Sequence, residues 1–200
     1  SLMADAFKLS EELDSPILLR STTRISHAKA VVQVDGERPE QEPPLAFSHL
    51  PQKYVMVPSY ARPRHPLMEQ RISRAAQLFE QFPGNEVVWG DKKLGVVSSG
   101  VAYQYAREAL PEASFLKLVT TYPLPQELVR AFAAEVDTLL VVEELDPFLE
   151  DHIRLMGIPV RGKALFPVTG ELSTQLVLEG ANEAGLMRHE VKKAVAVPDL

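Results

Sequence analysis

Gly-Val-Val-Ser-Ser-Gly at residues 95–100 is the first of three apolar runs that decide the fold of this chain. Phe-Leu-Lys-Leu-Val-Thr-Thr-Tyr-Pro at 115–123 and Thr-Leu-Leu-Val-Val-Glu-Glu at 138–144 are the other two, and apolar residues at helical spacing follow each run. Short apolar runs that alternate with amphipathic helices are typical of parallel sheets. The sequence therefore predicts an α/β fold, an open and mostly parallel sheet with helices on both faces.

Polar residues lie where each predicted strand ends. The carboxyl ends of parallel strands meet at one edge of a sheet, and α/β proteins bind ligands there. We therefore expect one polar rim, made of Ser98, Ser99, Thr120, Thr121, Tyr122, Glu143 and Glu144.

The turn from Ser98 to Gly100 could offer the amide groups of a helix N-terminus to a phosphate. It lacks the G-x-G-x-x-G spacing of dinucleotide-binding turns, and no Walker lysine follows it. The favoured interpretation is a tight turn that binds no ligand.

Glu143 and Glu144 are neighbours at the end of a predicted strand. Neighbouring side chains of a strand point to opposite faces, so the two carboxylates should not form an acid–base pair. Capping of the next helix is favoured, with Asp146 as N-cap and Pro147 at the first helical position. His152 on that helix is expected to be buried and hydrogen-bonded.

The composition is that of a globular chain and excludes several function classes. The 200 residues are 46% hydrophobic and 24% charged, which allows a sizeable core. The net charge of -6 argues against a nucleic-acid or anionic-membrane surface, and no apolar run approaches the roughly 18 to 20 residues that cross a bilayer. Without cysteine, the chain provides no thiolate for an iron–sulfur cluster. We expect a cytoplasmic location.

Residues 1–34 predict only part of a domain. Apolar residues recur at helical spacing from Leu2 to Leu13, and the runs at 17–19 and 30–34 predict two buried strands. One helix and two strands cannot cover both faces of a sheet. We therefore interpret this range as the C-terminal remnant of a larger domain.

Residues 35–82 are predicted to be a proline-rich connector that ends in a linking helix. Seven of the sixteen prolines lie between residues 35 and 66, which predicts extended chain, with an edge strand possible at 54–57. The linking helix should run from Pro66 to about Phe82. The α/β domain itself is expected at 83–170, with short edge strands at 158–160 and 165–167, and a short helix within 171–180 begins a final linker segment, 171–200.

The segment Arg-Ser-Thr-Thr-Arg-Ile-Ser-His at residues 20–27 follows a predicted strand. An arginine at such a place could hold the carboxylate of a 2-oxoacid or a phosphate, and a purely structural role fits equally well. The five histidines lack the H-x-x-x-H and H-E-x-x-H spacings, which argues against a zinc site, and no G-x-S-x-G nucleophile elbow occurs.

Seven motifs, in order along nearly the whole chain, resemble the alpha subunit of indolepyruvate ferredoxin oxidoreductase. Each motif is weak alone, and the family resemblance rests on all seven occurring in register. They are Leu-Leu-Arg-Ser-Thr-Thr-Arg-Ile-Ser-His (18–27), Lys-Tyr-Val-Met-Val-Pro (53–58), Trp-Gly-Asp-Lys (89–92), Ser-Gly-Val-Ala-Tyr-Gln-Tyr (99–105), Leu-Val-Thr-Thr-Tyr-Pro (118–123), Val-Glu-Glu-Leu (142–145) and Gly-Glu-Leu-Ser (170–173).

The resemblance implies an enzyme that decarboxylates an aryl 2-oxoacid on thiamine diphosphate, reduces ferredoxin through iron–sulfur clusters and releases an acyl-coenzyme A. It implies a beta subunit, ferredoxin, the 2-oxoacid and coenzyme A as partners, and a dimer. Residues 1–34 would end the pyrimidine-type domain. Residues 83–170 would be similar to the C-terminal domain of transketolase and serve domain packing and the dimer interface. Residues 171–200 would lead toward the thiamine-diphosphate-binding domain.

Arg24 and His27 are the residues that this resemblance places near the active-site region. They lie in an arginine–serine–histidine stretch similar to one in related 2-oxoacid ferredoxin oxidoreductases. We expect them to line that region in the full-length enzyme.

Two departures from the family limit what this segment should do alone. Thiamine enzymes hold diphosphate and magnesium through a Gly-Asp-Gly motif, and the chain has only Gly90-Asp91-Lys92. The cysteines that hold clusters are also absent. We expect no cofactor or metal on the segment, and no activity without the rest of the enzyme. Two alternatives share the fold: a stand-alone α/β module that binds a nucleotide or an acyl carrier, and the equivalent domain of a 2-oxoacid dehydrogenase or transketolase.

Overall fold

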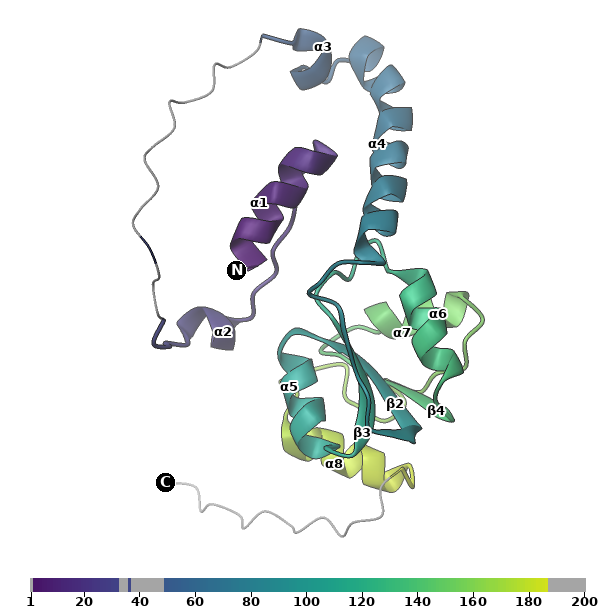
Figure 1. Cartoon of the computed structure of the whole chain (residues 1–200). Coiled ribbons are helices and arrows are strands. Elements are labelled where there is room, and N and C mark those ends of the chain that lie inside the picture. Colours follow the sequence, from purple (N-terminus) through teal and green to yellow (C-terminus); the bar gives the residue numbers. More distant parts are fainter. Residues whose placement is uncertain (1, 33–35, 37–48, 187–200) are drawn as a thin grey trace. The chain divides into compact units, whose positions relative to one another are not determined.

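The structure, a computed structural model, describes residues 2–32, 36 and 49–186, and the chain divides into two compact units at residues 1–74 and 75–200 (Figure 1). The second unit contains the three apolar runs that predicted the fold. No helix among the described residues combines the length and the apolar character that a membrane span requires.

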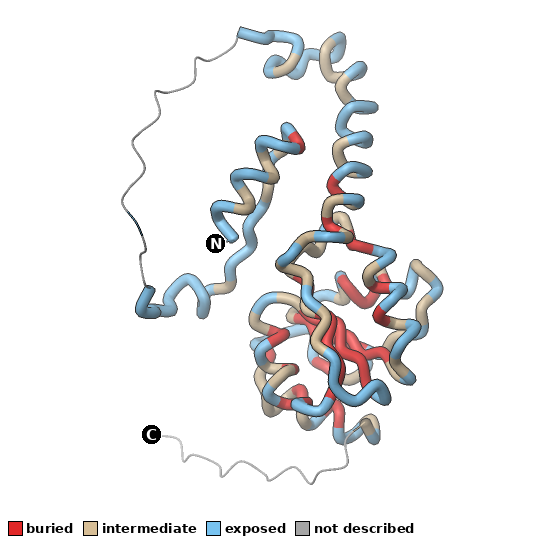
Figure 2. The backbone as a smooth tube through the Cα atoms, in the orientation of Figure 1, coloured by how far each residue is buried: buried red, intermediate tan, exposed pale blue. Residues whose placement is uncertain are grey.

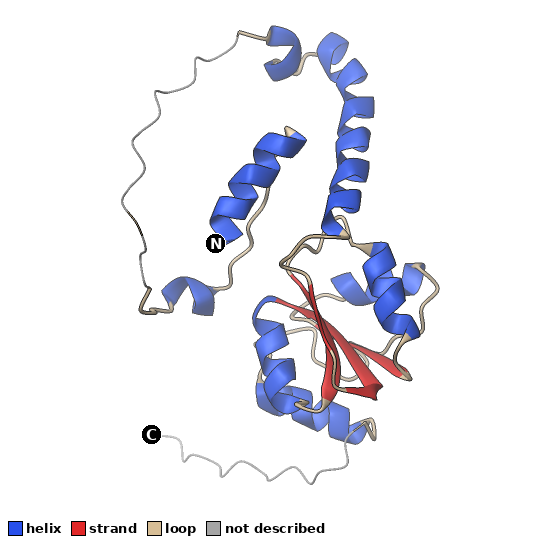
Figure 3. Ribbon diagram, in the orientation of Figure 1, coloured by secondary structure: helices blue, strands red, loops and turns tan. Residues whose placement is uncertain are grey.

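Four strands of the second unit form one sheet (Figure 3). They are β1 (Glu86–Val88), β2 (Asp91–Ser99), β3 (Ala113–Leu118) and β4 (Thr138–Val142), in the order β1-β3-β2-β4. Strand β2 pairs parallel with both β3 and β4, whereas β1 runs antiparallel to β3 at the edge. The predicted mostly parallel sheet is confirmed.

Helices cover both faces of this sheet and complete two hydrophobic cores. On one face, α5 (Gly100–Ala109) and α8 (Thr174–Glu183) pack on Val96, Phe115 and Leu140. On the other, α6 (Gln126–Ala134) and α7 (Phe148–Leu155) pack on Val97, Leu116 and Val141. Successive strand residues thus feed opposite cores, as the period of two requires. Figure 2 shows the buried residues concentrated in the strands between these helices.

A helix was predicted within residues 171–180, whereas α8 runs from Thr174 to Glu183 and contributes to the hydrophobic core. It begins at Thr174, where the Ser173 hydroxyl accepts a hydrogen bond from the Leu176 amide. Val177 and Ala181 are fully buried against α5. Gly180 allows the close approach, because a Cβ atom there would lie 2.5 Å from the Leu165 carbonyl oxygen.

The two edge strands predicted between α7 and α8 are wrong. Residues 158–160 are irregular, and only Arg161 extends the sheet, through an isolated parallel bridge to Leu140. Its amide donates to the Leu139 carbonyl (3.1 Å), and its carbonyl accepts from the Val141 amide (2.8 Å). Residues 165–167 form a turn and bend instead of a strand.

The first unit contains α1 (Leu2–Leu13), α2 (Thr23–His27), α3 (Pro51–Tyr54) and most of α4 (Pro58–Phe79). The helix predicted before Pro16 is confirmed. The linking helix begins at Pro58 rather than at Pro66, and both Pro63 and Pro66 lie inside it. Each proline lacks an amide donor, yet the turns on both sides stay helical, which the sequence rule against interior prolines did not foresee.

The three strands predicted in the first unit are wrong over the described residues. Residues 17–19 and 30–32 are irregular, and Leu18 is 93% exposed; residues 33–34 lie outside the described part of the chain. Tyr54 ends α3, and residues 55–57 are irregular and exposed. Apolar runs alone predicted these strands, and the described residues of the first unit form no strand.

Ion pairs tie the end of α1 to α3 and α4 within the first unit. The Asp14 carboxylate accepts hydrogen bonds from the Lys53 ammonium (2.5 Å) and from the Arg71 guanidinium. The bond from Lys53 is the main cause that lowers the pKa of Asp14 below its usual value. Asp14 adopts a positive φ of 46° at this turn, and Arg74 pairs with Glu12 at 3.1 Å.

Candidate functional site at the carboxyl ends of the strands

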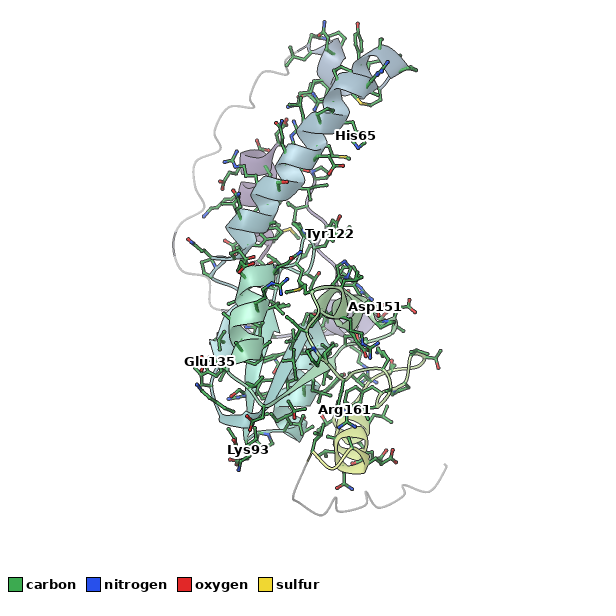
Figure 4. All side chains as sticks on the ribbon, turned by 90° about the vertical axis from the view of Figure 1, so that its right-hand side faces the viewer. His65, Lys93, Tyr122, Glu135, Asp151 and Arg161 are labelled. Atoms are coloured by element: carbon green, nitrogen blue, oxygen red, sulfur yellow. The ribbon has the colours of Figure 1, made fainter. Side chains whose placement is uncertain are left out.

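The parallel pairing brings the carboxyl ends of β2, β3 and β4 to one edge of the sheet, as the sequence predicted. In Figure 4, Tyr122, which follows β3, lies far from Lys93 near the start of β2. The side chains of this rim come from the strand ends and from the turns that lead into α5, α6 and α7.

Ser98 belongs to the sheet rather than to an open rim. Its side chain is buried, and its hydroxyl donates a 2.6 Å hydrogen bond to the Val142 carbonyl of β4. Ser99 is the N-cap of α5 but makes no side-chain cap bond, and Gly100 supplies the positive φ of 56° that the turn requires. The Ser98 hydroxyl therefore joins two strands.

Asn85 organises the end of β3, a role that no sequence motif indicates. Its side-chain oxygen accepts from the amides of Val119 (2.8 Å) and Thr120 (3.1 Å). Its side-chain nitrogen donates to the Thr120 hydroxyl (2.7 Å) and to the Phe79 carbonyl (2.9 Å). These four bonds fix the turn before Tyr122, whose side chain is exposed.

Glu143 caps α7 from the end of β4, and Asp146 does not. The buried Glu143 carboxylate accepts from the amides of Leu149 (2.8 Å) and Glu150 (3.0 Å). Pro147 occupies the N-cap position and makes no side-chain bond, which corrects the prediction that it is the first helical residue. Glu144 is only half-buried.

Glu150 and Lys163 complete a charged cluster around Glu143. Glu150 is 1% exposed; one of its oxygens accepts from the Lys163 amide (2.7 Å), and the Arg154 guanidinium lies 2.5 Å from the other without an aligned hydrogen bond. The Lys163 ammonium donates to the Glu143 carbonyl oxygen (2.5 Å) and to the Pro167 carbonyl (3.4 Å). We call these four residues, Glu143, Glu150, Arg154 and Lys163, the β4 cluster.

Burial dominates the electrostatics of the β4 cluster. It raises the pKa of Glu143, and the amides of Glu150 and Leu149 and the nearby Lys163 offset this rise only in part. Burial likewise lowers the pKa of Lys163, against the carboxylates around it. Because Glu143 and Glu150 accept from backbone amides, and Lys163 donates to backbone carbonyls, the cluster can fix the position of α7 and of the loop after it.

The stability of the 200-residue chain should depend on pH through Glu143. A raised pKa in the folded state means that this carboxyl stabilises the fold fully below its unfolded pKa, and that this contribution is lost as pH rises through the folded pKa. Urea unfolding of wild-type and Glu143→Gln chains should be measured from below the unfolded pKa of Glu143 to above its folded pKa. As pH rises, the free energy of unfolding of the wild type should fall relative to that of the variant. A constant difference would contradict this assignment.

His152 differs in part from its prediction. Its Nδ1 atom lies 2.7 Å from the Phe148 carbonyl oxygen, so the predicted hydrogen bond is present. The ring is half-exposed rather than buried, and its centroid lies 4.4 Å from that of the Phe148 ring. His152 therefore lies partly exposed on α7, whereas the next residue, Ile153, is buried in the core.

Arg24 and His27 both lie on α2 in the first unit, and both are exposed. The Thr22 hydroxyl accepts from the Ile25 amide (3.5 Å), and the Ser21 and Ser26 hydroxyls lie 3.0 Å apart. Polar residues of this segment thus shape α2. An open groove of the same unit is lined by other residues, namely Ser10, Glu11, Asp14, Ser15, Pro16, Lys53, Tyr54 and Arg64.

The described residues do not fit a resident metal, and the sequence does not fit an iron–sulfur cluster. Within residues 2–32, 36 and 49–186, no three histidine, aspartate or glutamate side chains gather as a metal site would require. The chain also contains no cysteine for an iron–sulfur cluster.

Comparison with known proteins gives a consistent set of relatives. The indolepyruvate oxidoreductase subunit IorA of Archaeoglobus fulgidus is 32% identical over 196 residues, which cover 96% of this chain and 30% of that protein. The subunits of the same name from Thermococcus kodakarensis and Methanothermobacter thermautotrophicus are 34% and 39% identical, over 87% and 76% of this chain and 29% and 25% of their own lengths.

The chain thus spans about a third or less of the length of the curated relatives it matches. No family model matches it. Among solved structures, a 2-oxoglutarate:ferredoxin oxidoreductase from Magnetococcus marinus, with 2-oxoglutarate, coenzyme A and succinyl-CoA bound, aligns with 64% of this chain and 24% of its own. The TM-score is 0.47 and the identity 17%, a likeness too low to indicate function.

Proposed function

This chain belongs to the family of the IorA subunits of indolepyruvate oxidoreductase, and we propose that it is a segment of a larger subunit that acts in 2-oxoacid oxidation. The observation that carries the proposal is the identity of 31–39% to six such subunits, along most of this chain. The mostly parallel α/β unit is compatible with it.

The proposed reaction of the full-length enzyme is the oxidative decarboxylation of indolepyruvate or another aryl pyruvate. The bond between the carboxylate and the keto carbon breaks and carbon dioxide leaves. Two electrons pass to ferredoxin, and the acyl group forms a thioester with coenzyme A. Thiamine diphosphate would supply the carbanion stabilisation and iron–sulfur clusters the electron path. The sequence has neither a Gly-Asp-Gly motif nor a cysteine, so both groups are proposed to be held elsewhere in the enzyme.

The proposed role of the segment is structural. The groups of the β4 cluster are engaged within the protein, which supports a scaffold that fixes α7 and the loop after it. Exposed apolar side chains such as Leu155 and Tyr122 would suit contacts with other domains or with a second copy in a dimer. A beta subunit and ferredoxin are the proposed protein partners, and the cytoplasm is the proposed location.

An anaerobic assay of the full-length protein, purified with its partner subunit, tests this function. We expect ferredoxin reduction that requires both coenzyme A and indolepyruvate, and slower reduction with pyruvate or 2-oxoglutarate. The 200-residue chain is the matched control, which we expect to bind no thiamine diphosphate with magnesium in a calorimetric titration. Absence of 2-oxoacid-dependent reduction by the full-length assembly would refute the function.

Arg24 is proposed to line the active-site region, where its guanidinium would hold the 2-oxoacid carboxylate. Charge-assisted hydrogen bonds to a carboxylate contribute about 1.5–3 kcal/mol, so Arg24→Ala should raise the KM for indolepyruvate at least about tenfold. Lys29→Ala changes a neighbouring exposed cation and should leave KM unchanged. Equal KM values for the two variants would contradict the proposal that Arg24, and with it His27, lines the active-site region.

A further inference from the structure

We propose that the open groove in the first unit binds a phosphate group of a small-molecule ligand, and that this phosphate competes with Asp14 for the cations around it. The groove lies where the end of α1 meets α3 and α4, and its volume is about 330 Å³. We call it the Asp14 groove, after a carboxylate that lines it together with Ser15, Lys53, Tyr54 and Arg64. The proposed site goes beyond the 2-oxoacid reaction and does not depend on it.

Cations outnumber carboxylates around the Asp14 groove. The Asp14 carboxylate accepts hydrogen bonds from the Lys53 ammonium (2.5 Å) and from the Arg71 guanidinium. The bond from Lys53 is the main cause that lowers the pKa of Asp14, and the charges of Arg71 and Arg64 lower it further. Glu11 is the second carboxylate that lines the groove. Three cations therefore face two carboxylates, which leaves a positive charge that an anion can neutralise.

Two of these cations have donors left over within the described part of the chain. The Arg64 guanidinium takes part in no hydrogen bond or ion pair with a described residue, and the side chain is half-buried at the groove. The Lys53 ammonium carries three donors, of which Asp14 and the neighbouring Tyr54 take two at most. The groove thus offers a guanidinium fork and an ammonium donor to one ligand.

A phosphate group matches these donors better than a single carboxylate does. A phosphate monoester carries a charge of about -1.5 to -2 at neutral pH and three strong acceptor oxygens. Two oxygens can accept from the Arg64 fork, and the third remains for the Lys53 ammonium. The volume of the groove lies at the lower end of the range for small-molecule sites, about 300 to 1,000 Å³. A phosphate or diphosphate group therefore suits it better than a large apolar ligand.

Amide NMR of the isotope-labelled 200-residue chain, titrated with sodium pyrophosphate at low ionic strength, tests the proposal. We expect saturable shifts at the amides of Ser15, Lys53 and Arg64, with a Kd below about 1 mM. The amides of β2 and β3 belong to the other unit and should not shift. A titration without saturable shifts at the groove would overturn the proposal, as would larger shifts elsewhere in the chain.

A pair of substitutions on α4 separates this site from general attraction to a cation. Arg64→Ala should raise the Kd for pyrophosphate at least about tenfold, because one charge-assisted contact is lost. Arg62 is exposed and does not line the groove, so Arg62→Ala should change Kd by less than about twofold. Far-UV circular dichroism should show equal helix content in the two variants. Equal Kd values would contradict the assignment of Arg64 to the site.

Asp14→Asn tests the competition between the carboxylate and the phosphate. The substitution keeps the size of the side chain and removes its charge, so the Kd for pyrophosphate should fall by up to about fivefold. A purely structural role of Asp14 predicts the opposite change, because loss of its ion pairs with Lys53 and Arg71 would loosen the groove. A higher or unchanged Kd would therefore overturn the proposed competition.

Adenosine 5′-diphosphate distinguishes the two sources of such a phosphate group. A Kd at least about tenfold below that of pyrophosphate would support a nucleotide ligand, whose base adds contacts. A Kd equal to that of pyrophosphate, or above it, would support the inorganic ion. These titrations require no turnover, so failure of the ferredoxin-reduction assay would refute the proposed function and leave the phosphate site standing.

Discussion

Phe115→Ala should lower the free energy of unfolding of the α/β unit by about 4 kcal/mol, within the range for a large aromatic side chain removed from a core. Phe115 is fully buried in β3, at the centre of the face covered by α5 and α8. Its ring meets that of Tyr103 edge-on, with centroids 5.7 Å apart. The substitution removes apolar contacts and leaves a cavity that the packed helices cannot fill. Urea unfolding of the 200-residue chain, followed by far-UV circular dichroism, measures the loss.

The matched control is Phe148→Ala, which removes the same side chain from a 41% exposed position on α7. Its cost should stay below about 1 kcal/mol, because little apolar surface returns to water. Similar losses at the two positions would show that the face between α5 and α8 is not the core of this unit.

Glu143→Ala should destabilise the same unit by about 2 kcal/mol at neutral pH. The change leaves two amides at the start of α7 without their acceptor and removes one of the carboxylates near the Lys163 ammonium. It also removes the burial penalty that raises the pKa of Glu143, so the net loss is smaller than the sum of the broken bonds. Thermal and urea unfolding both measure it.

Glu144→Ala is the control for this change, because it removes the same carboxylate from the next residue. Glu144 is half-buried, and its removal should alter stability by no more than about 0.5 kcal/mol. If Glu144→Ala were as costly as Glu143→Ala, the cap would not explain the effect of the first substitution.

The sequence predicted the sheet of the α/β unit because its signals are local. Three apolar runs at regular distances, each followed by helical spacing, suffice to indicate β2, β3 and β4 and the helices after them. The same local reading failed at residues 17–19, 30–32 and 54–57, where it again found apolar runs. Such runs report that a segment tends to be buried, and they do not say whether the covering residues belong to the same chain.

Long-range contacts explain what was missed in the candidate site. The polar residues at the end of β4 predicted a cap for α7. The prediction named Asp146, whereas the carboxylate that caps the helix is that of Glu143. Lys163 reaches the cluster from a loop twenty positions after Glu143, and no motif marks it. Asn85 binds the end of β3 from 34 and 35 positions away. Pairing across such distances depends on the fold, which single-sequence patterns do not encode.

The late position of α8 in the chain has a consequence for synthesis on the ribosome. Helices α6 and α7 leave the ribosome soon after the strands they cover, so one face of the sheet can close early. The other face waits for α8, which ends 41 residues after β4. At roughly 5 to 20 residues per second, this delay lasts about 2 to 8 seconds. During that interval α5 alone covers this face of the nascent sheet, and the apolar side chains of the core that α8 completes form a hydrophobic surface that chaperones could bind.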